Sequence, residues 1–138
     1  MALPFMGTVS RDDFDSGTAC AVAGGTTTLI DFAIPPKGGS LFATLKDWDA
    51  KAEGKARCDY TYHMAVTDWS DEIEKEIPRV VAERGINSFK IFLAYLGVFG
   101  VDDNQAFKIM RAVKKAGGLV TVHAVNGAVV AEMGNEFA

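Results

Sequence analysis

The sequence lacks any cysteine arrangement that would indicate disulfide bonds or a metal finger. Its two cysteines, Cys20 and Cys58, form no CxxC pair and no dense framework. A secreted scaffold held together by disulfides is therefore disfavoured. Residues 1–13 also lack the charged and then apolar order of a signal peptide. We expect a cytoplasmic protein.

Long apolar runs and a basic excess are missing as well. No apolar stretch reaches the roughly 18 residues that a membrane-spanning helix needs. The formal net charge is −4, which gives no electrostatic reason to expect a nucleic-acid partner. No linker or low-complexity segment divides the 138 residues, of which 49% are hydrophobic. We therefore expect a single domain over 1–138, with no second domain.

What the sequence does contain is a regular alternation of helical and strand patterns. Helical runs, two of which end at a glycine pair, alternate with short runs rich in β-branched residues. We expect helices over 11–25, 41–56, 70–85 and 101–118, a further helix from about residue 127, and strands over 26–34, 58–66, 88–95 and 119–125. Strands separated by helices of this length imply right-handed βαβ crossovers and a parallel sheet.

Two of the expected helices carry further predictions. Pro78 lies inside the pattern over 70–85, so we expect a kink there or two shorter helices. The buried face of the helix over 101–118 is expected to comprise Phe107, Met110, Val113 and the aliphatic stem of Lys114.

Two α/β architectures fit this order, an open doubly wound sheet and a (β/α)8 barrel of the TIM type. The GxGxxG fingerprint of dinucleotide-binding open sheets is absent after the first expected strand. A complete barrel takes roughly 250 residues, so a chain of this length would hold about half of one. We therefore expect a partial barrel of about four βα units, and a chain that is a fragment.

The expected strand SFKIFLAY places one lysine among apolar and aromatic residues. Because side chains alternate along a strand, Phe89 and Ile91 share the face suited to packing under helices. Lys90 and Phe92 share the opposite face. Lysine is almost never fully buried unless it is paired, so Lys90 requires an explanation.

The other expected strands each carry a polar residue that alternation can place beside Lys90. These residues are His123 in the last strand, His63 in the second and Asp31 in the first. We expect all of them to face one interior, with Asp31 and His63 as supporting polar groups.

The chemistry open to Lys90 follows from burial, which disfavours the ammonium form and lowers the pKa of the amine. A neutral amine can act as a base, form a Schiff base, or add CO₂ to give a carbamate that could bridge metal ions. His123 could offer a neutral imidazole to a metal near its strand's C-terminal end, where the active sites of such barrels lie. Plainer interpretations stay open: Lys90 could reach solvent or pair with a carboxylate, and His123 and Tyr95 could be packing residues.

A resemblance sharpens this interpretation. Four segments resemble, in order and spacing, the dihydropyrimidinase/D-hydantoinase family of cyclic amidohydrolases: GTVSRDDFDSGTACAVAGGTTTLIDF, CDYTYHMAVTDW, GINSFKIFLAY and GGLVTVHAVNG. The resemblance covers essentially the whole chain. It implies a (β/α)8 barrel with a binuclear site for divalent metals, usually zinc, in a cytoplasmic homotetramer. It also implies hydrolysis of the ring amide of dihydropyrimidines or 5-substituted hydantoins to N-carbamoyl amino acids.

The resemblance assigns roles to matching residues. Lys90 matches the carboxylated lysine that bridges the metals, and His123 matches a metal-binding histidine. Tyr95 matches the tyrosine that donates a hydrogen bond to the substrate carbonyl as it becomes an oxyanion. The implied mechanism is attack on the ring amide carbon by hydroxide that the metals generate near neutral pH.

The resemblance also implies loops that gate the exocyclic group of the substrate. Leu3 and Phe5 resemble the first gate loop, and Phe92 and Phe99 match positions of the second. The family's H-x-H metal motif falls before residue 2, and its later histidine ligand and catalytic aspartate fall beyond residue 138. The chain alone is therefore expected to be inactive.

Other functions stay open as alternatives. One is a non-catalytic scaffold related to dihydropyrimidinase that serves in protein interactions, but such relatives lose metal ligands that this chain keeps, Lys90 and His123. Another is an allantoinase-type or dihydroorotase-type hydrolase. In every enzymatic reading the partner is a small cyclic amide or ureide.

Overall fold

The computed structural model describes residues 1–2, 4–5 and 7–137, with the backbone alone for residues 4 and 5. Its elements, in chain order, are β1 (Pro4–Phe5), β2 (Thr8–Val9), α1 (Phe14–Ala23), β3 (Thr28–Ala33), α2 (Leu41–Ala52), β4 (Asp59–Ala65), α3 (Asp71–Arg84), β5 (Ser88–Phe92), α4 (Asp103–Lys115), β6 (Leu119–His123) and α5 (Gly127–Glu136). The alternation expected from the sequence is confirmed from α1 onward.

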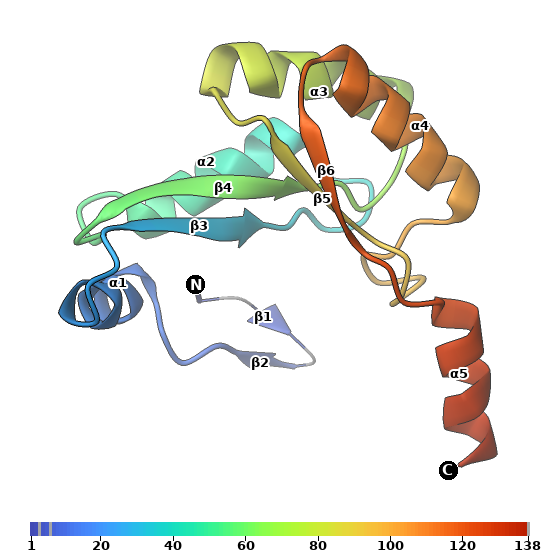
Figure 1. Ribbon diagram of the computed structural model, residues 1–138, viewed down its shortest axis with the longest axis horizontal. Helices are drawn as coiled ribbons and strands as arrows, with labels where there is room; N and C mark the ends of the chain where they lie inside the picture. The colour runs from blue at the N-terminus through green and yellow to red at the C-terminus, as the bar shows by residue number, and fades with distance from the viewer. Residues whose placement is uncertain (3, 6, 138) are drawn as a thin grey trace.

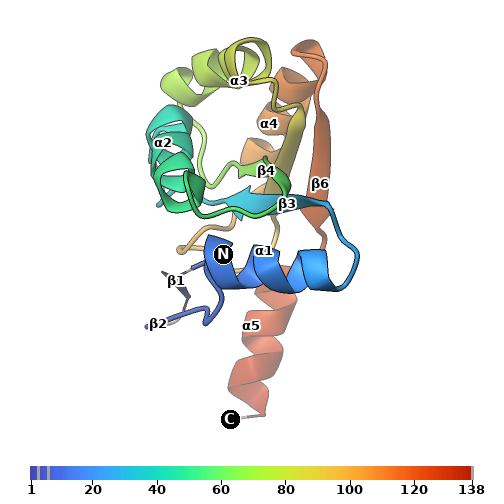
Figure 2. The same ribbon diagram turned by 90° about the vertical axis from the view of Figure 1, so that its left-hand side faces the viewer.

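A parallel sheet of four strands organises the chain. The strands lie side by side in chain order, β3-β4-β5-β6, and each neighbouring pair is parallel. Helices α2, α3 and α4, which connect them, lie along one face of this sheet (Figures 1 and 2). The α/β class and the parallel sheet are therefore confirmed, and the carboxyl ends of all four strands meet at one edge of the layer.

The core fills the space between the sheet and these helices. Phe89 and Ile91 are fully buried there, whereas Lys90 between them and Phe92 after them are only half-buried. The helices contribute Leu41, Leu45, Trp48, Ile73, Ile77, Val80, Ile109 and Val113. Alternation along β5 is therefore as expected, with the apolar set under the helices.

The buried face of α4 differs from the expectation. Ala106, Ile109 and Val113 face the core, whereas Phe107 is 60% exposed and Met110 is also exposed. α4 carries two adjacent apolar stripes, and its i, i+3, i+7 row of smaller residues is the one that fits against the sheet. The prediction of Phe107 and Met110 as core residues is wrong; Val113 alone of those apolar residues is buried.

α3 runs without a break through Pro78. Ser70 caps its first turn by accepting a hydrogen bond from the backbone N–H of Ile73, and the first turn is acidic, which complements the helix dipole. Pro78 is exposed, away from the packed side of the helix. The expected division into two shorter helices is therefore wrong.

Two parts of the chain lie outside this layered unit. β1 and β2 pair antiparallel as a short hairpin that the sequence did not predict. α5 extends away from the sheet and buries none of its residues (Figure 1). Among the described residues, no helix has both the length and the apolar character to cross a membrane.

Candidate active site

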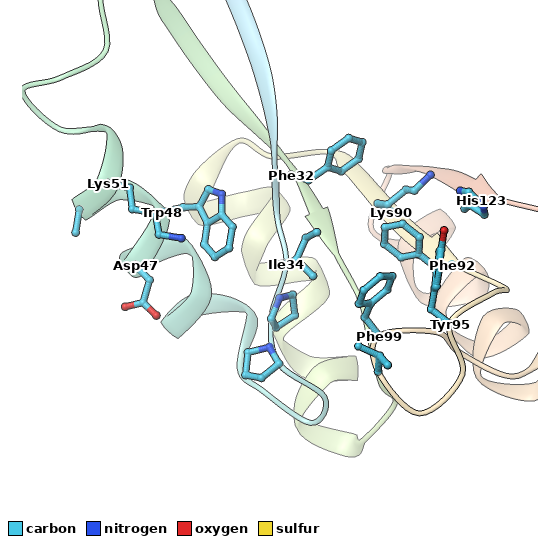
Figure 3. A pocket seen from close by; sticks show the side chains of 14 residues that line it. Phe32, Ile34, Asp47, Trp48, Lys51, Lys90, Phe92, Tyr95, Phe99 and His123 are labelled. Atoms are coloured by element: carbon cyan, nitrogen blue, oxygen red, sulfur yellow. The ribbon is translucent and has the colours of Figure 1, made fainter. Parts of the chain in front are cut away.

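A pocket of about 940 Å³ opens beside the carboxyl ends of the strands. Its lining residues are Phe32, Ile34, Pro35, Pro36, Asp47, Trp48, Ala50, Lys51, Lys90, Phe92, Tyr95, Val98, Phe99 and His123. Figure 3 shows Lys90, Tyr95 and His123 gathered at one side of this pocket, and Trp48, Asp47 and Lys51 across β3 on the other. The polar groups of chemical interest thus lie together on the side of β5 and β6.

Strand register brings Lys90 and His123 to the same face. Lys90 is paired in register with Thr121, and Phe92 is paired with His123, so Lys90 and His123 lie on the same side of adjacent strands. Both line the pocket. The prediction that they share one face near the strand ends is confirmed.

The surroundings of Lys90 are aromatic. Its ammonium nitrogen lies 5.0 Å from the ring centroid of Phe92 and 5.7 Å from that of Phe32. No carboxylate forms an ion pair with Lys90 within the described part of the chain. An aromatic ring face stabilises a cation less than a neighbouring carboxylate would. The Lys90 amine is therefore available to bind a ligand or to be modified.

Tyr95 follows β5 in a backbone conformation that non-glycine residues rarely adopt. Its φ is +60°, in the left-handed region. Its carbonyl accepts hydrogen bonds from the backbone N–H groups of Val98, Phe99 and Gly100, at 3.1, 3.3 and 3.0 Å. This tight loop ends β5 at Phe92, earlier than the sequence suggested, and turns the Tyr95 ring toward His123, with 5.7 Å between ring centroids.

The aromatic wall of the pocket is continuous. The ring of Phe92 lies 4.8 Å from that of Phe99 and 6.0 Å from that of His123, and the rings of Tyr95 and Phe99 are 5.0 Å apart. Phe92 therefore lies on the face of Lys90, as alternation predicted, and Phe99 packs against its ring. The gating role of the two residues stays a prediction.

His63 also lies on the face of Lys90, as predicted. It shares that face because Ala65, two residues on, is in register with Lys90. Its Nδ1 lies 2.5 Å from the Ser88 hydroxyl and its ring packs against Phe32 at 5.0 Å. Burial, and to a lesser degree the charge of Lys90, lower the pKa of His63, which favours a neutral imidazole.

Asp31 does not join this group, and the prediction that it faces the same interior is wrong. Asp31 is in register with Tyr62, whereas its neighbour Phe32 is in register with His63. It therefore points to the helix side, where it accepts hydrogen bonds from the Trp48 indole at 3.1 Å and from the N-terminal amine of Met1 at 2.6 Å. Alternation within a strand could not reveal this, because the relative register of two strands decides which residues share a face.

Comparison with known proteins adds a second line of evidence. No family model matches the chain. It is 50% identical over 130 residues to a dihydropyrimidinase of Dictyostelium discoideum, covering 94% of this chain and 26% of that protein. It is 47% identical over 128 residues to a D-hydantoinase of Geobacillus stearothermophilus, covering 93% of this chain and 27% of that protein.

Solved structures agree with the sequence comparison. A D-hydantoinase crystal structure superposes with a TM-score of 0.95 at 43% identity, covering 99% of this chain and 30% of that one. A dihydropyrimidinase from Brevibacillus agri gives a TM-score of 0.95 at 42% identity, with the same coverage. The chain belongs to the dihydropyrimidinase/D-hydantoinase family. It spans about a quarter of the length of the curated relatives it matches.

The metal site that the resemblance implies can be compared with the donors that the chain provides. Within the described residues, no group of three or more His, Cys, Asp and Glu side chains comes close enough to hold a metal ion. Lys90 and His123 supply one amine and one imidazole on the same face. That pair fits as part of a ligand set and does not form one by itself.

The expected first gate loop comprises Leu3 and Phe5. Leu3 and the side chain of Phe5 lie outside the described residues; the backbone of Phe5 belongs to β1 and is in register with Thr8.

Sequence reasoning missed Lys37, which directly follows the pocket-lining Pro36. Lys37 lies in a loop rich in proline and glycine, PPKGG, and donates hydrogen bonds to two distant backbone carbonyls. A single charged residue between Pro36 and Gly38 was the available signal.

Proposed function

We propose that the full-length protein is a metal-dependent hydrolase of cyclic amides, with this sequence forming part of a (β/α)8 barrel. "Full-length protein" here means one in which this sequence occupies the corresponding quarter of a chain of its relatives' length. The reaction is opening of the ring amide of hydantoins or dihydropyrimidines to N-carbamoyl amino acids. The observation that carries the proposal is the convergence of Lys90, Tyr95 and His123 on one pocket at the strand ends.

Lys90 and His123 are the residues of this chain that would hold the metals. Lys90, as a carbamate, presents two oxygens, and His123 presents a neutral ring nitrogen. Bound divalent ions lower the pKa of water, so that hydroxide becomes available near neutral pH. Zinc and a homotetrameric assembly belong to the same proposal and are open to elemental analysis and sedimentation.

The other residues of the pocket bind and orient the substrate. The phenol of Tyr95 donates a hydrogen bond to the carbonyl oxygen, and this bond strengthens as negative charge develops in the transition state. Phe92 and Phe99 pack against the ring and its exocyclic group and exclude water. His63 lies on the same face as Lys90, where burial lowers the pKa of its imidazole and its Nδ1 contacts the Ser88 hydroxyl.

The experiment is hydrolysis by the purified full-length protein of hydantoin, dihydrouracil, allantoin and dihydroorotate, with metal content measured on the same samples. Wild type is expected to open hydantoin or dihydrouracil. Lys90→Ala should lose both bound metal and turnover, and short carboxylic acids should restore part of the turnover by replacing the bridging anion. Lys115→Ala, at the exposed end of α4, serves as the matched control.

Two outcomes would redirect the proposal. Preference for allantoin or dihydroorotate would keep the metal chemistry and change the substrate class. A folded wild-type protein that binds no metal and opens none of the rings would instead support the non-catalytic scaffold.

A further inference from the structure

Lys37 joins three successive loops at the carboxyl ends of the strands. It lies between β3 and α2, and its ammonium donates hydrogen bonds to the Gly100 carbonyl at 3.0 Å and to the Thr67 carbonyl at 3.4 Å. Thr67 lies between β4 and α3, and Gly100 lies between β5 and α4. The Thr67 hydroxyl returns a hydrogen bond to the Pro36 carbonyl at 3.3 Å. The loops after β3 and β4 are therefore joined by hydrogen bonds donated from each to the other.

Gly100, the partner of Lys37 in the third loop, is itself hydrogen-bonded to Tyr95. Its carbonyl accepts the hydrogen bond from the Lys37 ammonium, and its backbone N–H donates a hydrogen bond to the Tyr95 carbonyl at 3.0 Å. Gly100 is buried, and an added Cβ would lie 2.2 Å from the Ala94 carbonyl oxygen. Lys37 thus acts on a point of the loop that is closely packed against the residues on either side of Tyr95.

The conformation of Tyr95 requires such support. A left-handed backbone is unfavourable for a tyrosine, so its surroundings must impose it. Three N–H groups converge on its carbonyl, and the base of the loop is closed by a hydrogen bond from Val101 N–H to the Phe92 carbonyl at 2.9 Å. The Lys37 side chain joins this loop to the loops after β3 and β4.

We propose that Lys37 is a positioning residue for Tyr95: its ammonium holds the 93–102 loop in the conformation that aims the tyrosine into the pocket. The proposal rests on the proposed function, because the value of aiming Tyr95 comes from its contact with the reacting carbonyl. A lysine that only stabilised the fold would change stability and leave the turnover of folded protein unchanged.

The kinetic test uses the full-length protein and the better of hydantoin and dihydrouracil. Lys37→Met keeps the aliphatic stem and removes the donor, and should lower kcat about 10- to 100-fold with little change in KM, because a misplaced Tyr95 loses a contact made mainly in the transition state. Lys37→Arg keeps donors that can reach both carbonyls and should recover most of the loss. Lys46→Met, on the exposed side of α2, is the control and should leave kcat unchanged.

A double-mutant cycle distinguishes action through Tyr95 from any other effect. Tyr95→Phe removes the hydroxyl and should itself lower kcat. If Lys37 acts through Tyr95, adding Lys37→Met to Tyr95→Phe should cost less than about twofold more. Losses that multiply independently would overturn the proposal.

Hydrogen exchange of the same proteins supplies a readout that needs no activity. Peptides covering 93–101 should exchange faster in Lys37→Met than in wild type and Lys46→Met, with the core strands unchanged. Unchanged exchange there, or a failure of both Lys37→Met and Lys37→Gln to fold, would overturn the proposal. If wild type opens no ring at all, the proposed function fails, and exchange alone decides whether Lys37 positions the loop.

Discussion

At the scale of single residues, Gly100 shows how little freedom the pocket rim has. A Cβ at this position would lie 2.2 Å from the Ala94 carbonyl oxygen and 2.9 Å from the Leu96 nitrogen, both of them backbone atoms. Backbone cannot move aside as a flexible side chain can. A side chain here would force the loop that carries Tyr95 to open.

Gly100→Ala is therefore expected to destabilise the full-length protein by about 1–3 kcal/mol, the usual cost of overpacking. The measurement is urea unfolding. Gly24→Ala is the matched control, because Gly24 has a φ of −86° and its Cβ would meet only ordinary contacts at 3.5 Å. An equal effect of the two substitutions would show that the rim adapts freely.

Single residues also show what sequence reasoning could reach at the site. Lys90 and His123 were placed together because each stands out among apolar neighbours and alternation assigns each a face. Asp31 was misplaced because alternation fixes faces within a strand and says nothing of the register between strands. The indole N–H of Trp48, which binds Asp31 on the helix side, comes from a residue that the pattern could only describe as apolar.

At the scale of elements, α4 gives the sharpest test of packing. Ile109 is fully buried, and Phe107, two residues earlier, is 60% exposed with Arg111 stacked on its ring. Ile109→Ala should destabilise the full-length protein by about 2–5 kcal/mol through lost burial and a cavity. Phe107→Ala should cost less than about 1 kcal/mol. Chemical denaturation measures both losses of stability. A larger loss for Phe107→Ala than for Ile109→Ala would mean that α4 buries the face predicted from the sequence.

The N-terminus of α1 provides a prediction about pH. Asp13 caps this helix, and hydrogen bonds from the backbone N–H groups of Ser16 and then Asp15 lower the pKa of its carboxyl. A carboxyl whose pKa is lowered in the folded state stabilises the fold above its unfolded pKa of about 3.9, and this contribution is lost as pH falls through the folded pKa.

Asp13→Asn keeps a good cap that does not titrate. The variant should therefore lose less stability than wild type when the pH is lowered from 7 to 3. Thermal unfolding at both pH values measures this difference. If the difference in unfolding temperature between the two proteins were the same at pH 7 and pH 3, Asp13 would not titrate as a helix cap.

Elements were predictable where their patterns are long. Helices and strands of five or more residues carry enough alternation and capping chemistry to be read, and their order follows from the sequence. The hairpin of β1 and β2 was missed because two-residue strands carry no periodicity. The early end of β5 was missed because it depends on the left-handed backbone of Tyr95, a conformation that three N–H donors impose.

At the scale of the whole molecule, the sheet has one covered face and one open face. Helices cover the side of Phe89 and Ile91, whereas Ile30 and Phe32 on the opposite side are 50% and 37% exposed. β3 and β6 stand at the edges of the four-stranded sheet. Unpaired edges and an uncovered apolar face favour association with other chains. Closure of a barrel would bury both the edges and this apolar face. The strand count, the missing GxGxxG fingerprint and the family resemblance suggested a barrel, but the strands that would close it are not in this sequence.

Ile30→Lys distinguishes an open sheet face from one enclosed in a barrel, because the substitution should reduce self-association in the first case and destabilise the fold in the second. Ile30 is in register with Thr61 on the face of His63 and Lys90, which a closed barrel would place inside. We expect the 138-residue chain alone to self-associate and to hydrolyse no hydantoin with zinc, manganese or cobalt. In this chain Ile30→Lys should shift size-exclusion profiles toward monomer.

In the full-length protein, Ile30→Lys should bury a charge and destabilise the fold by about 2 kcal/mol or more. Ala82→Lys, on the exposed face of α3, adds the same charge and should do neither. A stabilising or neutral Ile30→Lys in the full-length protein would mean that this face of the sheet stays open to water and that the barrel does not close over it.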